Sequence, residues 1–156
     1  MTPTRITTSL GAAALAAALA FGGAPLGNAA TVKPFGTVET LTDANGAVVT
    51  AYTVTGLKAS SDRIPWPVMG KLYEATVTAT AQRGTVTPVI PMFNARAANG
   101  QTYRVLANVA TPQGINPATL PQGAKSTGKI YFDVVGATPN SVVYNNGAED
   151  LLIWVG

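Results

Sequence analysis

Residues 71–83 alternate between two kinds of side chain with a period of two. The apolar set is Tyr73, Ala75, Val77, Ala79 and Ala81, and the polar set is Glu74, Thr76, Thr78, Thr80 and Gln82. Successive side chains of a β-strand point to opposite faces, so this pattern predicts a strand with one face in the core and the other in water. Half-buried strands of this kind are typical of antiparallel sheets.

Turn signals divide the rest of the chain into further short strands. Three Asn-Gly pairs, at 45–46, 99–100 and 146–147, supply the positive φ that tight hairpins need. We expect strands at 36–42, 47–57, 71–83, 92–96, 101–109, 127–135, 141–144 and 150–155. Two prolines confine 85–91 to an edge or a bulge. This spacing predicts an all-β protein, an immunoglobulin-like antiparallel β-sandwich, with a small barrel as the alternative.

The first 29 residues have the three parts of a secretory signal peptide. Arg5 lies in a short polar segment, residues 10–21 form an apolar run, and small residues follow up to Ala29. A retained membrane anchor is the alternative, but the run is short for a bilayer and helix-breaking residues follow it. We expect cleavage after Ala29, one domain over residues 30–156, a secreted, extracellular product, and no membrane span after cleavage.

Cysteine and histidine are both absent from the sequence. Their absence excludes Cys and His nucleophiles, Ser-His pairs and zinc sites built from Cys and His. We therefore predict no cofactor, no metal site and no catalytic residues. Because the chain cannot form disulfides, its domain has to be stabilised by the packing of its core.

Basic residues are dispersed along the chain. Without Arg5, nine Lys and Arg residues stand against seven Asp and Glu residues, and the basic residues form no run. Proteins that bind nucleic acids gather positive charge on one face or in one segment. The sequence therefore predicts no nucleic-acid partner.

Several segments closely resemble one known family. They are Arg83–Pro88, Phe93–Arg96, Tyr103–Leu106, Pro121–Gly123, Ser126–Val134 and Asn145–Trp154. In these segments, and more loosely before residue 71, the chain is similar to the small secreted immunogenic (immunoprotective extracellular) proteins of mycobacteria. The resemblance implies an immunoglobulin-like β-sandwich that is exported and antigenic to the host. It supplies no catalytic residues, and it suggests a binding role only by analogy with other sandwiches of this class.

Trp66 is the first candidate contact for a partner. It lies between Pro65 and Pro67 in the expected loop 58–70, and Arg63 is close to it in sequence. A rigid, exposed aromatic side chain makes a good binding anchor. The alternative is that Trp66 folds back and caps one end of the sandwich. Trp154, by contrast, lies in an apolar strand and is expected in the core.

Arg96, Tyr103 and Arg104 form a second candidate contact. They flank the expected turn at Asn99-Gly100, so the two arginines can form a small basic patch beside Tyr103. The alternative is an ordinary solvated sheet face.

These observations favour a secreted, non-enzymatic antigen that acts as a binding module for a host or cell-surface protein. One alternative is a structural or accessory protein that stays with the cell envelope. Another is a hydrolase that uses carboxylates alone, drawn from Glu74, Asp133, Glu149 and Asp150. The identity of the partner and the oligomeric state stay open at this point.

Overall fold

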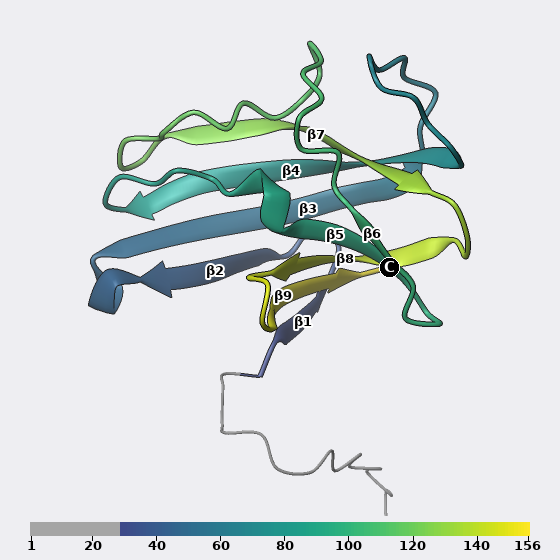
Figure 1. Ribbon diagram of the computed structural model, residues 1–156. Coiled ribbons are helices and arrows are strands. Elements are labelled where there is room, and N and C mark those ends of the chain that lie inside the picture. The colour runs from purple at the N-terminus through teal and green to yellow at the C-terminus, as the bar shows by residue number, and fades with distance from the viewer. Residues whose placement is uncertain (1–28) are drawn as a thin grey trace, which may run out of the picture.

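The computed structural model describes residues 29–156, which form two packed β-sheets (Figure 1). Its strands are β1 (Thr31–Pro34), β2 (Val38–Asp43), β3 (Val48–Ala59), β4 (Lys71–Arg83), β5 (Phe93–Ala97), β6 (Thr102–Arg104), β7 (Lys125–Val134), β8 (Pro139–Asn145) and β9 (Asp150–Val155). Two short 3-10 helices, η1 (Ala44–Gly46) and η2 (Ile90–Met92), interrupt them. The predicted signal peptide lies outside the described residues except for Ala29, so it stays a prediction.

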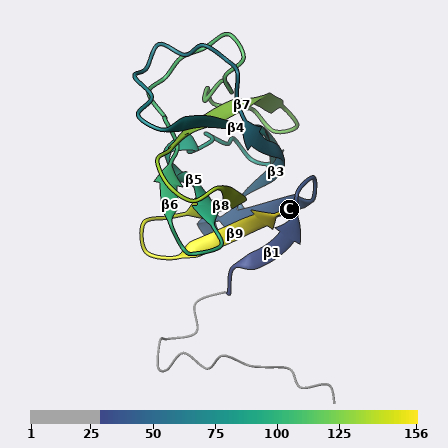
Figure 2. The same ribbon diagram turned by 90° about the vertical axis from the view of Figure 1, so that its right-hand side faces the viewer.

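The two sheets stack face to face, as Figure 2 shows from the side. One sheet has four strands in the order β2-β3-β4-β7, and the other has five in the order β1-β9-β8-β5-β6. All neighbouring strands are antiparallel except β1 and β9, which pair in parallel. This arrangement confirms the predicted all-β, immunoglobulin-like antiparallel sandwich. Within residues 29–156, no helix is long and apolar enough to cross a membrane.

A cluster of aromatic side chains holds the two sheets together. Phe93 on β5 is fully buried and contacts Tyr52, Tyr144 and Trp154, with ring centroids 5.4, 5.1 and 6.3 Å away. Trp154 is fully buried, as predicted, and its indole N–H donates to Thr37 O over 2.9 Å. Because aromatic side chains bury large apolar areas, this cluster is a main source of stability in the fold.

The expected strand 101–109 is wrong beyond Arg104. Its pattern of alternating side chains continues to Val109, but the chain leaves the five-stranded sheet and crosses to the edge of β7. There Leu106 N donates to Tyr131 O over 2.9 Å, and Ile115 N donates to Lys129 O over 3.0 Å. Residues 105–117, here called the edge segment, cover part of an otherwise open strand edge.

Two other segments lie outside the strands that the sequence predicts. Residues 85–91 form no strand, consistent with their prolines, and make a single bridge from Val86 to Leu120. Strand β1 was not predicted, because its four residues are all exposed and carry no alternating pattern. It is held instead by backbone pairing with β9.

Candidate binding surface

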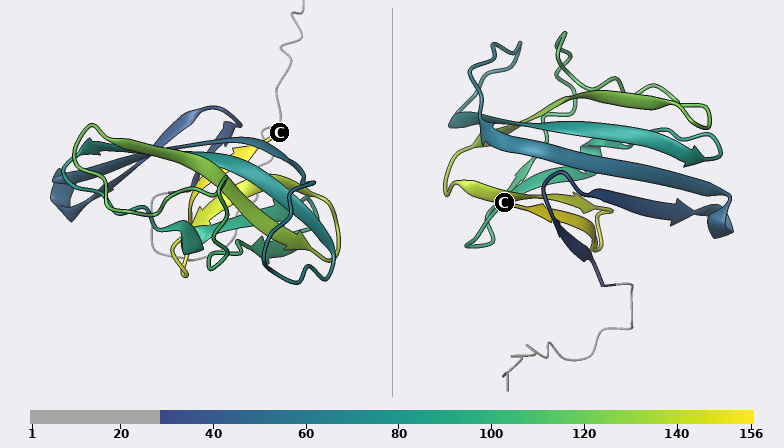
Figure 3. Two further views of the ribbon diagram at one scale, coloured as in Figure 1. Left: turned by 90° about the horizontal axis from the view of Figure 1, so that it is seen from above. Right: turned by 180° about the vertical axis from the view of Figure 1, so that it is seen from behind.

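The loop between β3 and β4, residues 60–70, projects from the same end of the molecule as the edge segment (Figures 1 and 3). Pro65 and Pro67 restrict the backbone on either side of Trp66. The chain therefore presents Trp66 on a short, stiff span. Whether Trp66 is held in one position for binding depends on how firmly the two ends of this loop are attached to the sheet.

A polar cluster fixes the first end of the loop to the sheet. Lys129 Nζ donates to Asp62 Oδ2 over 2.7 Å and to Glu74 Oε2 over 3.0 Å. The Tyr131 hydroxyl donates to the same Asp62 oxygen over 2.7 Å, and the Ser60 hydroxyl donates to Glu74 Oε2. These five residues, the Lys129 cluster, join the loop to β4 and β7.

The groups of the Lys129 cluster shift one another's pKa values. Hydrogen bonds from Lys129 and Tyr131 hold the pKa of Asp62 below its ordinary value. The carboxylates of Asp62 and Glu74 in turn raise the pKa of Lys129. Burial, with the Asp62 carboxylate beside it, raises the pKa of the Tyr131 hydroxyl. Glu74 lies on the face of β4 that the alternating pattern assigns to water, yet it is only 6% exposed because this cluster covers it.

A carboxylate fixes the other end of the loop. The backbone N–H groups of Met69 and Gly70 donate to the two oxygens of Asp133, each over 2.8 Å. Gly70 is required here, because a Cβ atom at this position would lie 2.1 Å from Val134 O. The loop is therefore tied to β7 at both ends.

The fixed loop carries exposed apolar side chains. Trp66 is 46% exposed and Met69 is 86% exposed, while Arg63 on the same loop is also exposed. Trp66 and Arg104 line one shallow hollow of about 260 Å³, together with Pro91 and residues 105–109. The structure thus brings together two predicted contact residues that are far apart in sequence.

Arg96 is placed differently from this surface. It makes a bidentate ion pair with Asp150, in which Nη1 donates to Oδ2 over 2.6 Å and Nη2 to Oδ1 over 2.9 Å. Asn145 also donates to Asp150. The Asp150 carboxylate raises the pKa of Arg96, and the guanidinium lowers the pKa of Asp150. The positive charge of Arg96 is therefore neutralised by Asp150 within the five-stranded sheet.

Tyr103 faces the core, not the two arginines. It pairs with Ala95 in the strand register, whereas Arg104 pairs with Asn94 and Arg96 with Thr102. Side chains of adjacent strand residues point to opposite faces, so Tyr103 lies on the other side of the sheet from both arginines. It is 6% exposed, and its hydroxyl donates to Ala137 O over 2.8 Å. Of the three residues, the structure places only Arg104 beside Trp66.

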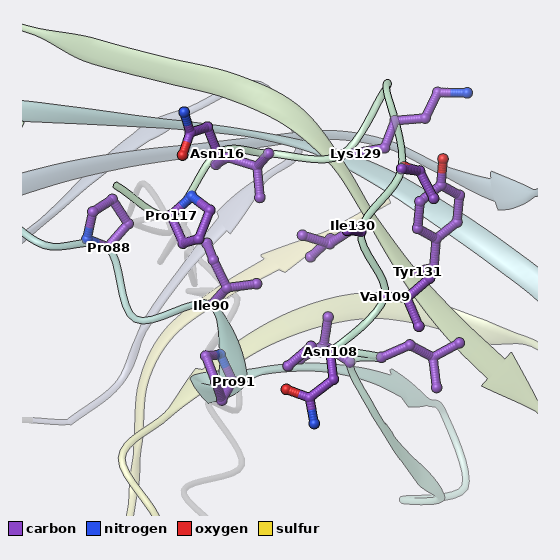
Figure 4. Close-up of a pocket in the computed structure, with 17 residues that line it drawn as sticks. Pro88, Ile90, Pro91, Asn108, Val109, Asn116, Pro117, Lys129, Ile130 and Tyr131 are labelled. Carbon is purple, nitrogen blue, oxygen red and sulfur yellow. The ribbon is translucent and has the colours of Figure 1, made fainter. Parts of the chain in front are cut away.

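Sequence reasoning missed an apolar cavity of about 560 Å³ behind the edge segment (Figure 4). It lies between that segment, β7 and residues 88–91, and it shares the wall 105–109 with the hollow beside Trp66. The cavity was not expected because residues 101–109 were predicted to form a strand, and a paired strand would leave no space beside residues 105–109. The prolines at 88, 91, 112 and 117 were the available signal that this region is irregular.

The carboxylates of the hydrolase alternative are already engaged or separated. Asp133 accepts the two loop N–H groups, Asp150 binds Arg96, and Glu74 binds Lys129. Glu149 is exposed in the turn before β9. Within the described residues, no three or more acidic side chains gather in a way that could hold a metal ion.

Comparison with known proteins gives consistent matches. Residues 30–154 match a family described as a domain of unknown function, DUF1942. The chain is 49% identical over 154 residues to immunogenic protein MPB63 of Mycobacterium bovis and immunogenic protein MPT63 of Mycobacterium tuberculosis, covering 97% of this chain and 96% of each relative. A crystal structure of the secreted protein MPT63 from Mycobacterium tuberculosis matches with a TM-score of 0.80 and 50% identity, covering 83% of this chain and 100% of that one.

Proposed function

The chain belongs to the DUF1942 family and is similar to the secreted, immunogenic mycobacterial protein MPT63, and we propose that it is a non-enzymatic binding module for a protein outside the bacterial cell. The proposed contact surface, called the Trp66 surface, consists of Arg63, Trp66, Met69 and Arg104. One observation carries the proposal: an exposed tryptophan stands on a loop that is tied to the sheet at both ends.

Rigid presentation matters because ordering a flexible loop during binding costs free energy. The Lys129 cluster and Asp133 fix this loop before any partner arrives. Trp and Arg are also the side chains most enriched among residues that dominate binding free energy. Since both nearby charged residues of the surface are arginines, the complementary partner is an acidic protein surface.

We also propose cleavage after Ala29. The family match begins at residue 30, and the first strand begins at Thr31, so cleavage there leaves every strand of the sandwich intact. The full chain expressed in a mycobacterial host is expected in the medium with Ala30 as its first residue, as read by mass spectrometry. If the mature protein remains with the envelope fraction, the envelope-associated alternative is favoured.

The binding proposal is tested with protein recovered from that medium. Surface proteins of host cells are captured, each captured protein is purified, and its Kd is measured for the wild type, Trp66→Ala and Val38→Ala. Val38 is a matched control because it is 56% exposed on β2, at the opposite edge of the four-stranded sheet from β7. We expect Trp66→Ala to weaken binding at least about tenfold, with Val38→Ala unchanged. Equal affinity of a folded Trp66→Ala variant for every purified partner would refute the Trp66 surface.

A further inference from the structure

We propose that the cavity behind the edge segment binds an uncharged, largely apolar small molecule. This inference does not depend on the Trp66 surface, because Trp66 and Arg104 line the smaller hollow and do not line this cavity. The cavity is partly open to solvent, since lining residues such as Asn108, Ala110 and Asn116 are exposed. Its volume of about 560 Å³ lies within the range of small-molecule sites.

Core side chains form the inner part of the cavity wall. Ile90, Val105, Ile115 and Ile130 all line it, and each is at most 9% exposed. Figure 4 shows Ile90 and Ile130 on either side of the space, with Pro117 above Ile90 and Pro91 below it. Such a wall favours a ligand with an aliphatic or aromatic body, because binding removes the apolar surfaces of both the cavity and the ligand from water.

The charge of the wall favours an uncharged ligand. Lys129 is the one charged residue among those that line the cavity. Its amine is already bound by Asp62 and Glu74, and Figure 4 shows it directed away from Ile130. An anionic head group would thus find no free cation and would lose its hydration, which is costly.

Polar groups at the exposed rim of the cavity are available to a ligand. They are the side-chain amides of Asn108 and Asn116, which line the cavity and are exposed. The Thr111 hydroxyl also belongs to a lining residue, but its oxygen is fully buried near the Tyr131 hydroxyl, so a ligand does not reach it. A ligand with a single donor or acceptor, such as an alcohol or a secondary amine, can pair with one of the rim amides.

The cavity is held open by backbone pairing. Lys129 N donates to Gln113 O over 2.8 Å, and Ile115 N donates to Lys129 O over 3.0 Å. Gly128 permits this close approach, since a Cβ atom there would lie 2.4 Å from Ile115. The edge segment is therefore fixed to β7, and the cavity is formed before a ligand binds.

Two probes that share one ring system test the proposal on the mature protein recovered from the medium. N-phenyl-1-naphthylamine is uncharged, and 1-anilinonaphthalene-8-sulfonate adds an anionic sulfonate to the same skeleton. We expect saturable binding of the uncharged probe, at least about tenfold tighter than that of the anionic probe. Dodecanol is expected to displace the bound probe, and dodecanoate at neutral pH is not.

A filled cavity supplies the decisive variant. Ala110 is an exposed lining residue, so Ala110→Trp fills the space without changing the core, and Ala98→Trp places the same side chain in the β5–β6 turn away from the cavity. We expect Ala110→Trp to weaken probe binding at least about tenfold and Ala98→Trp to leave it unchanged.

Three results would overturn the proposal: no saturable binding to the wild type, tighter binding of the anionic probe, or equal binding by a folded Ala110→Trp variant. Trp66→Ala is expected to keep full probe affinity. Loss of the partner-binding activity and loss of the cavity are thereby distinguished.

Discussion

Lys129 donates a hydrogen bond to Asp62 over 2.7 Å and thereby joins residues that are 67 positions apart in the chain. The contact ties the loop of residues 60–70 to strand β7. Lys129 also binds the nearly buried Glu74, so a single amine contacts two carboxylates, and Lys58 Nζ lies 3.9 Å from Oε1 of Glu74. The position of Trp66 in the loop therefore depends on Lys129, a residue of strand β7.

Replacing this amine is expected to loosen the loop. In Lys129→Met, Asp62 loses its ion-pair partner, and the nearly buried Glu74 keeps only the longer contact of 3.9 Å between its Oε1 and Lys58 Nζ. We expect a lower midpoint of thermal unfolding, faster amide exchange in residues 60–70 and a red-shifted emission of Trp66. Lys125→Met, an exposed lysine of the same strand, is the matched control. Unchanged exchange in residues 60–70 would show that Asp133 alone fixes the loop.

Replacing Glu39 is expected to stabilise the protein. Glu39 is 4% exposed, and its carboxylate oxygens form no hydrogen bond of ordinary geometry with the described residues. Burial raises its pKa above the ordinary 4.5, and Ile153 and Lys33 oppose this shift without cancelling it. A raised carboxyl pKa means that ionisation costs stability, so the free energy of unfolding falls as pH rises from about 4.5 through the folded pKa.

Glu39→Gln removes this charge and should raise the free energy of unfolding by about 1 kcal/mol at pH 7. The gain should shrink toward zero below the ordinary pKa of 4.5, where wild-type Glu39 is protonated in both states. Urea unfolding at several pH values measures it. Glu149→Gln, at an exposed turn residue, should show no comparable gain. A loss of stability at pH 7 in Glu39→Gln would contradict the expected cost of ionisation.

The ion pair between Arg96 and Asp150 has the opposite dependence on pH. The guanidinium lowers the pKa of Asp150 below 3.8, so the pair contributes stability above that pH and loses it as pH falls through the folded pKa. Asp150→Asn is expected to cost about 1–2 kcal/mol at pH 7, a value reduced by partial exposure. Between pH 5 and 2, its free energy of unfolding should fall less than that of the wild type. Parallel curves would assign the acid sensitivity to other groups.

Truncation at the centre of the aromatic cluster is expected to be severe. Phe93 is fully buried against Tyr52, Tyr144 and Trp154, so Phe93→Ala leaves a cavity between the two sheets. The expected loss is about 3–5 kcal/mol, measured by urea unfolding. Phe35→Ala, at a residue packed against the edge of the core, should cost less. A loss near zero at Phe93 would show that the sheets repack around the smaller side chain.

The sequence was most informative where local pattern and tertiary surroundings agree. Residues 71–83 and 150–155 were predicted with the bounds that the structure has, because their side chains and flanking turns mark a strand. The stretch 101–109 failed because alternation persists beyond Arg104 while the backbone changes partner from β5 to β7. The period of the side-chain pattern does not show which strand a segment will pair with.

The candidate surface was predictable only as separate residues. Trp66 between two prolines was visible as an anchor, and Arg104 as a cation, but their shared hollow depends on two loops meeting in space. Tyr103 and Arg96 looked equivalent to Arg104 in sequence. Strand register turns Tyr103 inward, and Asp150, which is 54 positions from Arg96, neutralises that arginine.

The pairing of β1 with β9 has a consequence for how the protein folds. Thr31–Pro34 lie alongside Leu152–Val155, so the first strand of the domain finds its partner in the last one. Pairings between such distant segments form slowly, because a long loop must close first. The leading strand therefore has no neighbour until Leu152–Val155 are in place, and the five-stranded sheet is completed only when β9 has folded.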